Sequence, residues 1–250
     1  MSSRVLYVTA CSAILQNIRL YRARRLPVSM LSKISNIKAH VRRWGWARTI
    51  YHAIMRGAAE YLGVHVCAVR TRAAAENPQL PCTLPGIDFR KVETHELLEA
   101  SEDGEFELDR DFVSEAIVRG DIAFGAFDQD VLVAYTWRTM NCAPHTDKLW
   151  VRVASPYNYS YKSFARAGYR GQRIAPSLLL FSDAEMLKLG CTHRAGIVAV
   201  TNFPSLELGK HMASEVIGYG AFAAYFGRCF SFRSRALVNI GLDFITPRGR

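Results

Sequence analysis

The segment from Phe164 to Leu180, FARAGYRGQRIAPSLLL, constrains the fold of this chain more than any other. Its start is typical of a strand, and Pro176 favours a helix beginning there, because proline suits the first helical turn. The loop between them, RGQRIA from Arg170 to Ala175, is rich in small and basic residues. Such a loop can present backbone N–H groups at a helix N-terminus, a geometry that binds pyrophosphate. An ordinary strand-to-helix turn with basic surface residues is the alternative.

The letters YRGQRIA in this loop resemble the acetyl-CoA-binding motif of the GNAT superfamily of N-acetyltransferases, usually met as Y-R-G-x-G-I-G/A. The matching residues are Tyr169, Arg170, Gly171, Ile174 and Ala175. Arg173 stands where the family usually has its central glycine. Downstream, the run from Asn202 to Ser205 is similar to the family's N-x-x-S/A element, which opens the next helix beside the coenzyme's pantetheine arm. Asn202 alone is also a good helix N-cap, but the helix cap does not explain why both motifs occur in this order.

The resemblance covers Ile87 to Phe244 and implies an α/β (α+β) fold of GNAT type, with a central mixed, mostly antiparallel sheet flanked by helices. The residue patterning of this region agrees with that order of elements. It predicts a strand at 87–92, helices at 94–100 and 109–119, a hairpin over 122–140, a loop with Cys142, Pro144 and His145, strands at 150–153 and 157–165, a helix at 176–189, a strand at 195–200, a helix at 203–212 and two closing strands over 216–232.

The resemblance further implies acetyl-CoA, or another acyl-CoA, as the cofactor, and we expect no metal. The strand before the loop is expected to splay from the strand at 195–200, with the pantetheine arm in the gap, paired with backbone near Phe164 to Arg166. The coenzyme-binding residues predicted in this way are Phe164, Ala165, Arg166, Arg170, Gly171, Gln172, Arg173, Ile174, Ala175, Asn202 and Ser205.

Acyl transfer of this kind is direct and needs no covalent enzyme intermediate. An aligned amine attacks the thioester, backbone N–H groups stabilise the oxyanion, a base takes the amine proton, and an acid protonates the thiolate. Many family members carry a tyrosine about seven residues after the asparagine of the second motif, and here that position is Gly209. Ser205 and Tyr219 are the predicted catalytic substitutes.

An aromatic strand and one histidine are the predicted acceptor pocket. Tyr157, Tyr159 and Tyr161 alternate along the strand and therefore share one face, and His145 belongs to a loop near the expected entrance. Structural roles are the alternative, with the tyrosines forming a half-buried aromatic face and His145 lying in solvent.

The positive charge of the chain is concentrated before the coenzyme motifs. Residues 1–72 hold 13 of the 32 Lys and Arg residues but one of the 22 acidic residues, so they carry +12 and the remainder −2. Residues 73–86, AAAENPQLPCTLPG, hold three of the nine prolines and are typical of a linker. We therefore predict a basic, partly helical N-terminal extension over 1–72, a linker over 73–86 and a GNAT-like acyltransferase domain over 87–250.

Within the basic extension, Arg42 to Leu62 is the best helix candidate. Trp46, Ile50 and Ile54 recur at four-residue steps between arginines, which is the pattern of an amphipathic helix. Such a helix can bind an anionic membrane surface, and its charge also suits an acidic acyl carrier protein. Packing on the catalytic domain is the alternative.

Composition narrows the setting of the protein. None of the six cysteines has metal-ligand spacing and no C-x-x-C occurs, so zinc is not expected. No run approaches the ~20 apolar residues of a membrane span. We expect a cytoplasmic protein, with membrane association through the basic region as the alternative.

The predicted function is therefore transfer of an acetyl group from acetyl-CoA to an amine of a small molecule or a peptide. Two alternatives stay open. One is a long-chain N-acyltransferase that uses acyl-CoA or acyl carrier protein. The other is a non-catalytic CoA-binding module whose basic arm holds a polyanion or a membrane. No nucleic-acid motif occurs, so nucleic acid is expected less than membrane.

Overall fold

The computed structural model describes residues 30–146, 149–225 and 228–245. The described part of the chain divides into two units between Ile54 and Met55. Helix α2 (Met30–Leu62) crosses this division, and its backbone leaves the helical range at Gly45, with φ 82° and ψ 167°. The predicted helix is thus present, begins earlier than expected, and is interrupted where glycine tolerates a positive φ. None of the helices in the described ranges is long and apolar enough to cross a bilayer.

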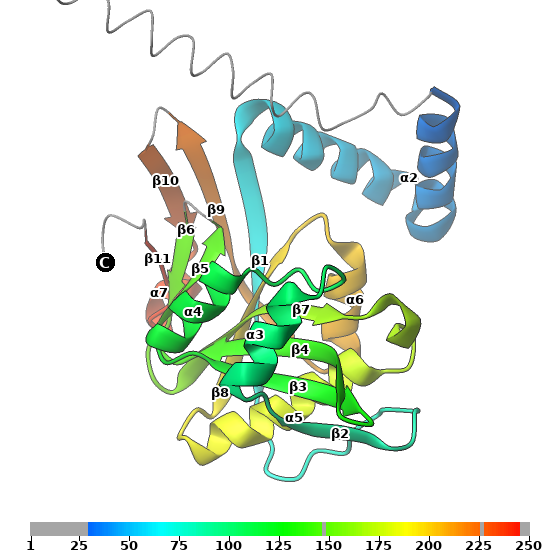
Figure 1. The fold of residues 1–250 in the computed structure, drawn as a ribbon. Helices are drawn as coiled ribbons and strands as arrows, with labels where there is room; N and C mark the ends of the chain where they lie inside the picture. Colours follow the sequence, from blue (N-terminus) through cyan, green and yellow to red (C-terminus); the bar gives the residue numbers. More distant parts are fainter. Residues whose placement is uncertain (1–29, 147–148, 226–227, 246–250) are drawn as a thin grey trace, which may run out of the picture. The chain divides into compact units, whose positions relative to one another are not determined.

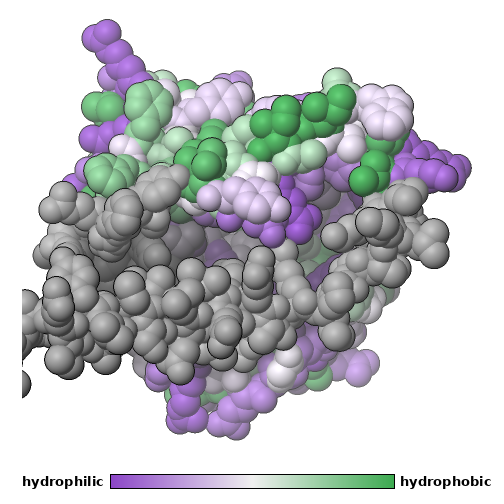
Figure 2. Space-filling model, turned by 90° about the horizontal axis from the view of Figure 1, so that it is seen from above, coloured by the Kyte–Doolittle hydropathy of each residue, from purple (hydrophilic) through white to green (hydrophobic). Residues whose placement is uncertain are grey.

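The predicted apolar stripe on α2 lies open at its surface. The exposed fractions of Trp46, Ile50 and Ile54 are 68%, 56% and 64%. These residues recur at four-residue steps and therefore lie along one side of the helix. Apolar side chains in green and hydrophilic ones in purple adjoin each other on the face seen in Figure 2.

The second unit is built on a large sheet with strand order β10-β9-β1-β8-β7-β4-β3-β2 and a smaller sheet with order β11-β6-β5 (Figure 1). The strands of the large sheet are β10 (Arg228–Arg233), β9 (Glu215–Tyr225), β1 (Val64–Ala73), β8 (His193–Ala199), β7 (Tyr157–Ala165), β4 (Val131–Thr139), β3 (Ile122–Asp128) and β2 (Ile87–Lys91). Those of the small sheet are β11 (Asp243–Ile245), β6 (Leu149–Arg152) and β5 (Cys142–Thr146). The helices are α3 (Thr94–Glu102), α4 (Arg110–Val118), the short 3₁₀ turn η1 (Ala167–Tyr169), α5 (Ile174–Lys188), α6 (Phe203–His211) and α7 (Arg235–Asn239).

Helices cover both faces of the large sheet, and strand alternation assigns side chains to each face. On β4, Ala134 belongs to the core cluster that includes Leu178 of α5. The next residue, Tyr135, belongs to the cluster that includes Leu97 of α3 and Val113 of α4. All neighbouring strand pairs in the large sheet are antiparallel except β7 and β8. The predicted fold class, a mixed and mostly antiparallel sheet flanked by helices, is confirmed.

The structure differs from the predicted domain boundary at residues 73–86. Strand β1, Val64–Ala73, belongs to the sheet, where it lies antiparallel between β8 and β9. Cys67, Ala68 and Val69 are buried at its centre. Residues 74–86 therefore join two strands of one sheet and do not separate two domains. Proline content signals a lack of regular structure but not whether a domain continues beyond it.

Candidate active site

Strands β7 and β8 part in the middle of the sheet, as predicted. They run parallel and pair from Tyr157 with His193 to Ser160 with Gly196, although β7 continues to Ala165. On its other edge, β7 has a bulge opposite Thr136 of β4, formed by Lys162 and Ser163, and Lys162 has a φ of 44°. A bulge bends its strand and increases the local twist. The bend lies where the two strands separate.

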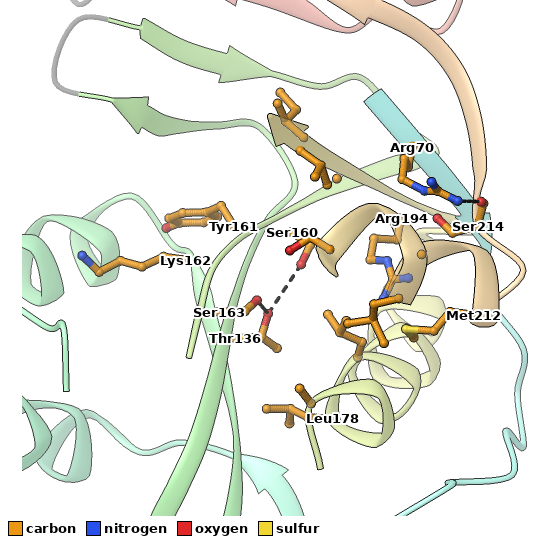
Figure 3. A pocket seen from close by; sticks show the side chains of 18 of the residues that line it. Arg70, Thr136, Ser160, Tyr161, Lys162, Ser163, Leu178, Arg194, Met212 and Ser214 are labelled. Carbon is orange, nitrogen blue, oxygen red and sulfur yellow. Dashed lines mark hydrogen bonds between the residues drawn. The ribbon is translucent and has the colours of Figure 1, made fainter. Parts of the chain in front are cut away.

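The opening between β7 and β8 is a cavity of about 430 Å³, closed by α5 and α6. Four predicted coenzyme residues line it: Phe164, Ala165, Ala175 and Ser205. Thr136 Oγ1 lies 2.7 Å from Ser163 Oγ and 3.5 Å from Ser160 Oγ on one side of the cavity. Figure 3 shows Arg70 and Arg194 on the opposite side, near α6.

In the described part of the chain, the edge of β7 beside this cavity pairs with no strand beyond Ser160. The Arg166 N–H donates to the Val133 carbonyl of β4 at 2.9 Å. Because successive amides of a strand point to opposite edges, the Ala165 N–H faces the open side. The Ala165 carbonyl accepts from Arg170 Nε at 3.1 Å. An extended ligand can therefore lie along this edge as an added strand does.

The loop before α5 has two residues in the left-handed region of backbone conformation. Gly171 has a φ of 87°, and Arg173 caps α5 in the left-handed region with φ 57° and ψ 22°. In the described part of the chain, no backbone carbonyl outside α5 accepts a hydrogen bond from the N–H groups of residues 171–175. Thr83 holds the loop, since its N–H donates to the Gln172 carbonyl at 3.2 Å. Arg173 thus adopts the conformation that glycine favours, and the departure from the GNAT pattern leaves the backbone glycine-like.

A basic cavity of about 600 Å³ lies beside this loop, between α5 and α6. Arg72, Arg173 and His211 line it, and Leu208 and Met212 line both it and the cavity at the split. The surroundings suit a phosphorylated ligand that reaches from the loop toward the open strands.

A third cavity, of about 680 Å³, lies on the side of β7 that carries Tyr159. Its walls include Phe112 of α4, Trp150 of β6 and His145. It shares four lining residues with the cavity at the split, which are Ser160, Tyr161, Lys162 and Ile197. Two cavities on opposite faces of the sheet therefore meet where β7 and β8 separate.

His145 lies on strand β5, where the sequence predicted a loop, and it is partly buried. Its Nδ1 lies 3.1 Å from the Tyr159 hydroxyl. Burial, with the charge of His65 as a smaller cause, lowers the pKa of His145 below its ordinary 6.5, so the ring is neutral at pH 7. Burial raises the pKa of Tyr159. The Tyr161 hydroxyl donates to Asp121 Oδ2 at 2.6 Å, and its pKa is raised by burial first and by that carboxylate second.

The structure places several predicted site residues away from the cavities. Tyr219 lies on β9 with an exposed fraction of 54%, and Tyr157 lies beside the His193 ring at 5.2 Å. The Arg166 guanidinium contacts Asp103 at 2.6 Å and Glu105 at 2.7 Å. Asn202 caps α6 by accepting from the Ser205 N–H at 3.2 Å.

Two arginines in the cavity at the split could not be found from the sequence. Arg70 comes from β1 and Arg194 from β8, and their exposed fractions are 6% and 7%. Burial is the largest cause of the lowered pKa of each. In the sequence Arg70 is one of many basic residues before residue 73, and nothing nearby distinguishes it.

No known protein-family model matches the chain. No curated protein matches it either. Among solved structures it is similar to a tandem GNAT protein from the clavulanic acid biosynthesis pathway, at 16% identity over 64% of this chain and 55% of that one, with a TM-score of 0.44. It is similar to a GCN5-related N-acetyltransferase from Kribbella flavida, at 13% identity over 66% of this chain and 62% of that one, with a TM-score of 0.43.

A third similar structure is the PaiA N-acetyltransferase from Thermoplasma acidophilum in complex with coenzyme A, at 14% identity over 50% of this chain and 87% of that one, with a TM-score of 0.36. The chain spans about half to three fifths of the length of the first two structures. At these identities and TM-scores, we base the function on the site of the chain itself.

Proposed function

We propose that the chain is an acyltransferase that moves an acyl group, with acetyl as the first expectation, from coenzyme A to an amine. The observation that carries the proposal is the junction of two cavities at the split between β7 and β8. The coenzyme would approach from the loop at 170–175, and the acceptor from the cavity that holds His145.

The residues present fit coenzyme A along its length. The N–H groups of residues 171–175 would hold the pyrophosphate, and the cavity with Arg72, Arg173 and His211 would take the phosphorylated adenosine. The pantetheine arm would lie along the free edge of β7 near Ala165. When bound, the coenzyme supplies the thioester.

The acceptor amine would enter the cavity lined by His145, Trp150 and Tyr159. A neutral imidazole can accept the proton that an alkyl amine must lose before it attacks. Because its pKa is lowered by burial, His145 is in this state at pH 7. Holding the amine beside the thioester contributes to the rate by orientation.

Calorimetric titration of the full chain with acetyl-CoA tests the proposal. The double variant Arg170→Ala, Gly171→Asp should abolish binding, because an aspartate in the cradle repels the pyrophosphate. Gly190→Asp is the matched control, since Gly190 has a φ of 86° against 87° for Gly171 and neither has an atom within 4 Å of an added Cβ. Equal loss in both variants, or no binding of acetyl-, butyryl- or palmitoyl-CoA by the wild type, would refute the proposal.

A separate observation favours a second role for the first unit. We propose that the exposed stripe of Trp46, Ile50 and Ile54 binds an anionic membrane surface. Arginines flank the stripe, and residues 1–59 contain no acidic residue, which suits negatively charged lipid headgroups.

Co-sedimentation of the full chain with vesicles of phosphatidylglycerol, and with vesicles of phosphatidylcholine, tests this role. We expect binding to the anionic vesicles only, and a loss of about tenfold in the variant Trp46→Ser, Ile50→Ser. Val118→Ser, which removes a side chain that is 88% exposed in the second unit, should bind as the wild type does. Wild-type binding by the double variant would overturn this assignment.

A further inference from the structure

Arg70 has a hydrogen-bond donor without a partner beside the coenzyme cavity. Two nitrogens of its guanidinium are engaged, one with the Leu206 carbonyl at 3.2 Å and one with the Ser214 carbonyl. Its Nε is buried and has no hydrogen-bond partner in the described part of the chain. The side chain lines the cavity at the split, and Arg70 has an exposed fraction of 6%. A buried donor left unpaired costs free energy unless a ligand satisfies it.

Gly209 of α6 makes room for this guanidinium. A Cβ added at Gly209 would lie 2.5 Å from Arg70 Nε and 2.7 Å from Arg70 Cζ. The position where the GNAT resemblance leads one to expect a tyrosine is therefore occupied by an arginine from a strand more than a hundred residues earlier. Any larger residue at 209 would displace Arg70.

The register of the sheet aligns Arg70 of β1 with the strand residues at which the two cavities meet. Arg70 pairs with Gly196 across β1 and β8, and Gly196 pairs with Ser160 across β8 and β7. Directly paired residues project to the same face. Since Gly196 has no side chain, and an added Cβ there would meet no atom within 4 Å, the space between Arg70 and Ser160 is open. Figure 3 shows Arg70 and Ser160 on opposite sides of this space.

We propose that Arg70 is a catalytic residue that stabilises the coenzyme A thiolate as it leaves, through a hydrogen bond from its Nε–H to the sulfur. The inference rests on the proposed function, which brings the thioester to this junction. The amine nitrogen bonds to the carbonyl carbon, and the carbonyl electron pair moves to oxygen. When the carbonyl re-forms, the carbon–sulfur bond breaks and its electron pair stays on sulfur. The amine proton passes to His145 and then to water, and Arg70 keeps its own proton.

The charged groups around Arg70 favour an anion at this position. Arg194 of β8 lines the same cavity and Arg72 lies two residues along β1, and both of these arginines pair with the buried Asp183 of α5. Glu207 of α6 is an acidic group near Arg70, and its charge opposes the lowering of the Arg70 pKa by burial. A thiolate beside a guanidinium has a lowered pKa, so coenzyme A can depart without a proton donor.

Calorimetry with coenzyme A and with desulfo-coenzyme A, at pH 7 and pH 9, tests this without any acceptor. If the free thiol is given the cysteine pKa of about 8.5, a fall of one to two units on binding makes the affinity for coenzyme A rise about tenfold between these pH values. Desulfo-coenzyme A lacks the sulfur. Dividing the affinity for coenzyme A by the affinity for desulfo-coenzyme A therefore removes the contribution of all other titrating groups. The ratio of the two affinities should therefore rise about tenfold in the wild type.

Two variants locate the effect. In Arg70→Gln the ratio should stay flat, because the cation is gone. In Gly209→Ala it should also flatten, because the added Cβ displaces the guanidinium while the arginine remains. A flat ratio in the wild type, or a rise that survives in both variants, would overturn the role of Arg70. Failure of both ligands to bind the wild type would instead overturn the proposed function, and the inference with it.

Discussion

The substitution Asp183→Asn tests how the face of the sheet covered by α5 is held together. Asp183 of α5 is 1% exposed and faces three arginines from three strands. Arg138 contacts it at 2.9 Å, Arg72 at 3.2 Å and Arg194 at 3.3 Å. Arg138 is fully buried, and burial lowers its pKa to about 10 despite the nearby carboxylate. Asparagine keeps the shape of the side chain but leaves the cations without a counter-charge.

The expected loss in the free energy of unfolding is about 3–5 kcal/mol, which is typical of removing one partner from a buried ion pair. For a unit of this size, each kcal/mol lowers the melting temperature by about 2–4 °C, so the shift should be roughly 6–20 °C. Thermal unfolding followed by circular dichroism measures it.

Glu185→Gln is the matched control on the same helix. Glu185 pairs with Lys188 at 2.6 Å, but the Lys188 side chain is 67% exposed. An exposed pair contributes about 0–1 kcal/mol, so this variant should unfold close to the wild type. A loss below about 1 kcal/mol in Asp183→Asn, or equal losses in the two variants, would refute the reasoning that one buried carboxylate balances the cluster.

Three further predictions concern single residues. Arg173→Gly should raise the free energy of unfolding by about 1 kcal/mol in urea titration, because the left-handed backbone at this position is unfavourable for arginine; a loss of stability would contradict the assigned conformation. Because the pKa of His145 is lowered in the folded state, the unfolded chain binds the proton first, and the free energy of unfolding falls as the pH drops below about 6.5. His145→Gln should flatten this fall. Wild-type pH dependence in that variant would exclude a depressed pKa. Tyr161→Phe should cost about 1.5–3 kcal/mol, because it removes a hydrogen bond to the Asp121 carboxylate, which still accepts from Arg119 Nε. The exposed Tyr219→Phe should change stability by less than about 0.5 kcal/mol.

Local signals carried the predictions that the structure confirms. The order of strands and helices from Ile87 onward follows from apolar periodicity and from helix caps, which involve only residues near one another in sequence. Asn202 could be assigned as a helix cap because capping depends on a residue and the N–H groups two or three positions later. The strand, loop and helix over 164–180 are encoded in the same way.

The tertiary structure alone decided how β1 and its side chains enter the site. The position of Val64–Ala73 between β8 and β9 depends on pairing with residues more than a hundred positions away, and no short window contains both partners. Arg70 is one basic residue among many in the sequence and becomes a buried donor only because Gly209 and Gly196 leave space on either side. His145, expected in a loop, lies on β5 because β5 pairs with β6, and His145 itself sits at the shift in register between Pro144 and Thr146. The sequence by itself determined most elements and the glycine-containing loop before α5 through local backbone preferences, whereas the long-range register of the sheet determined which side chains meet at the split between β7 and β8.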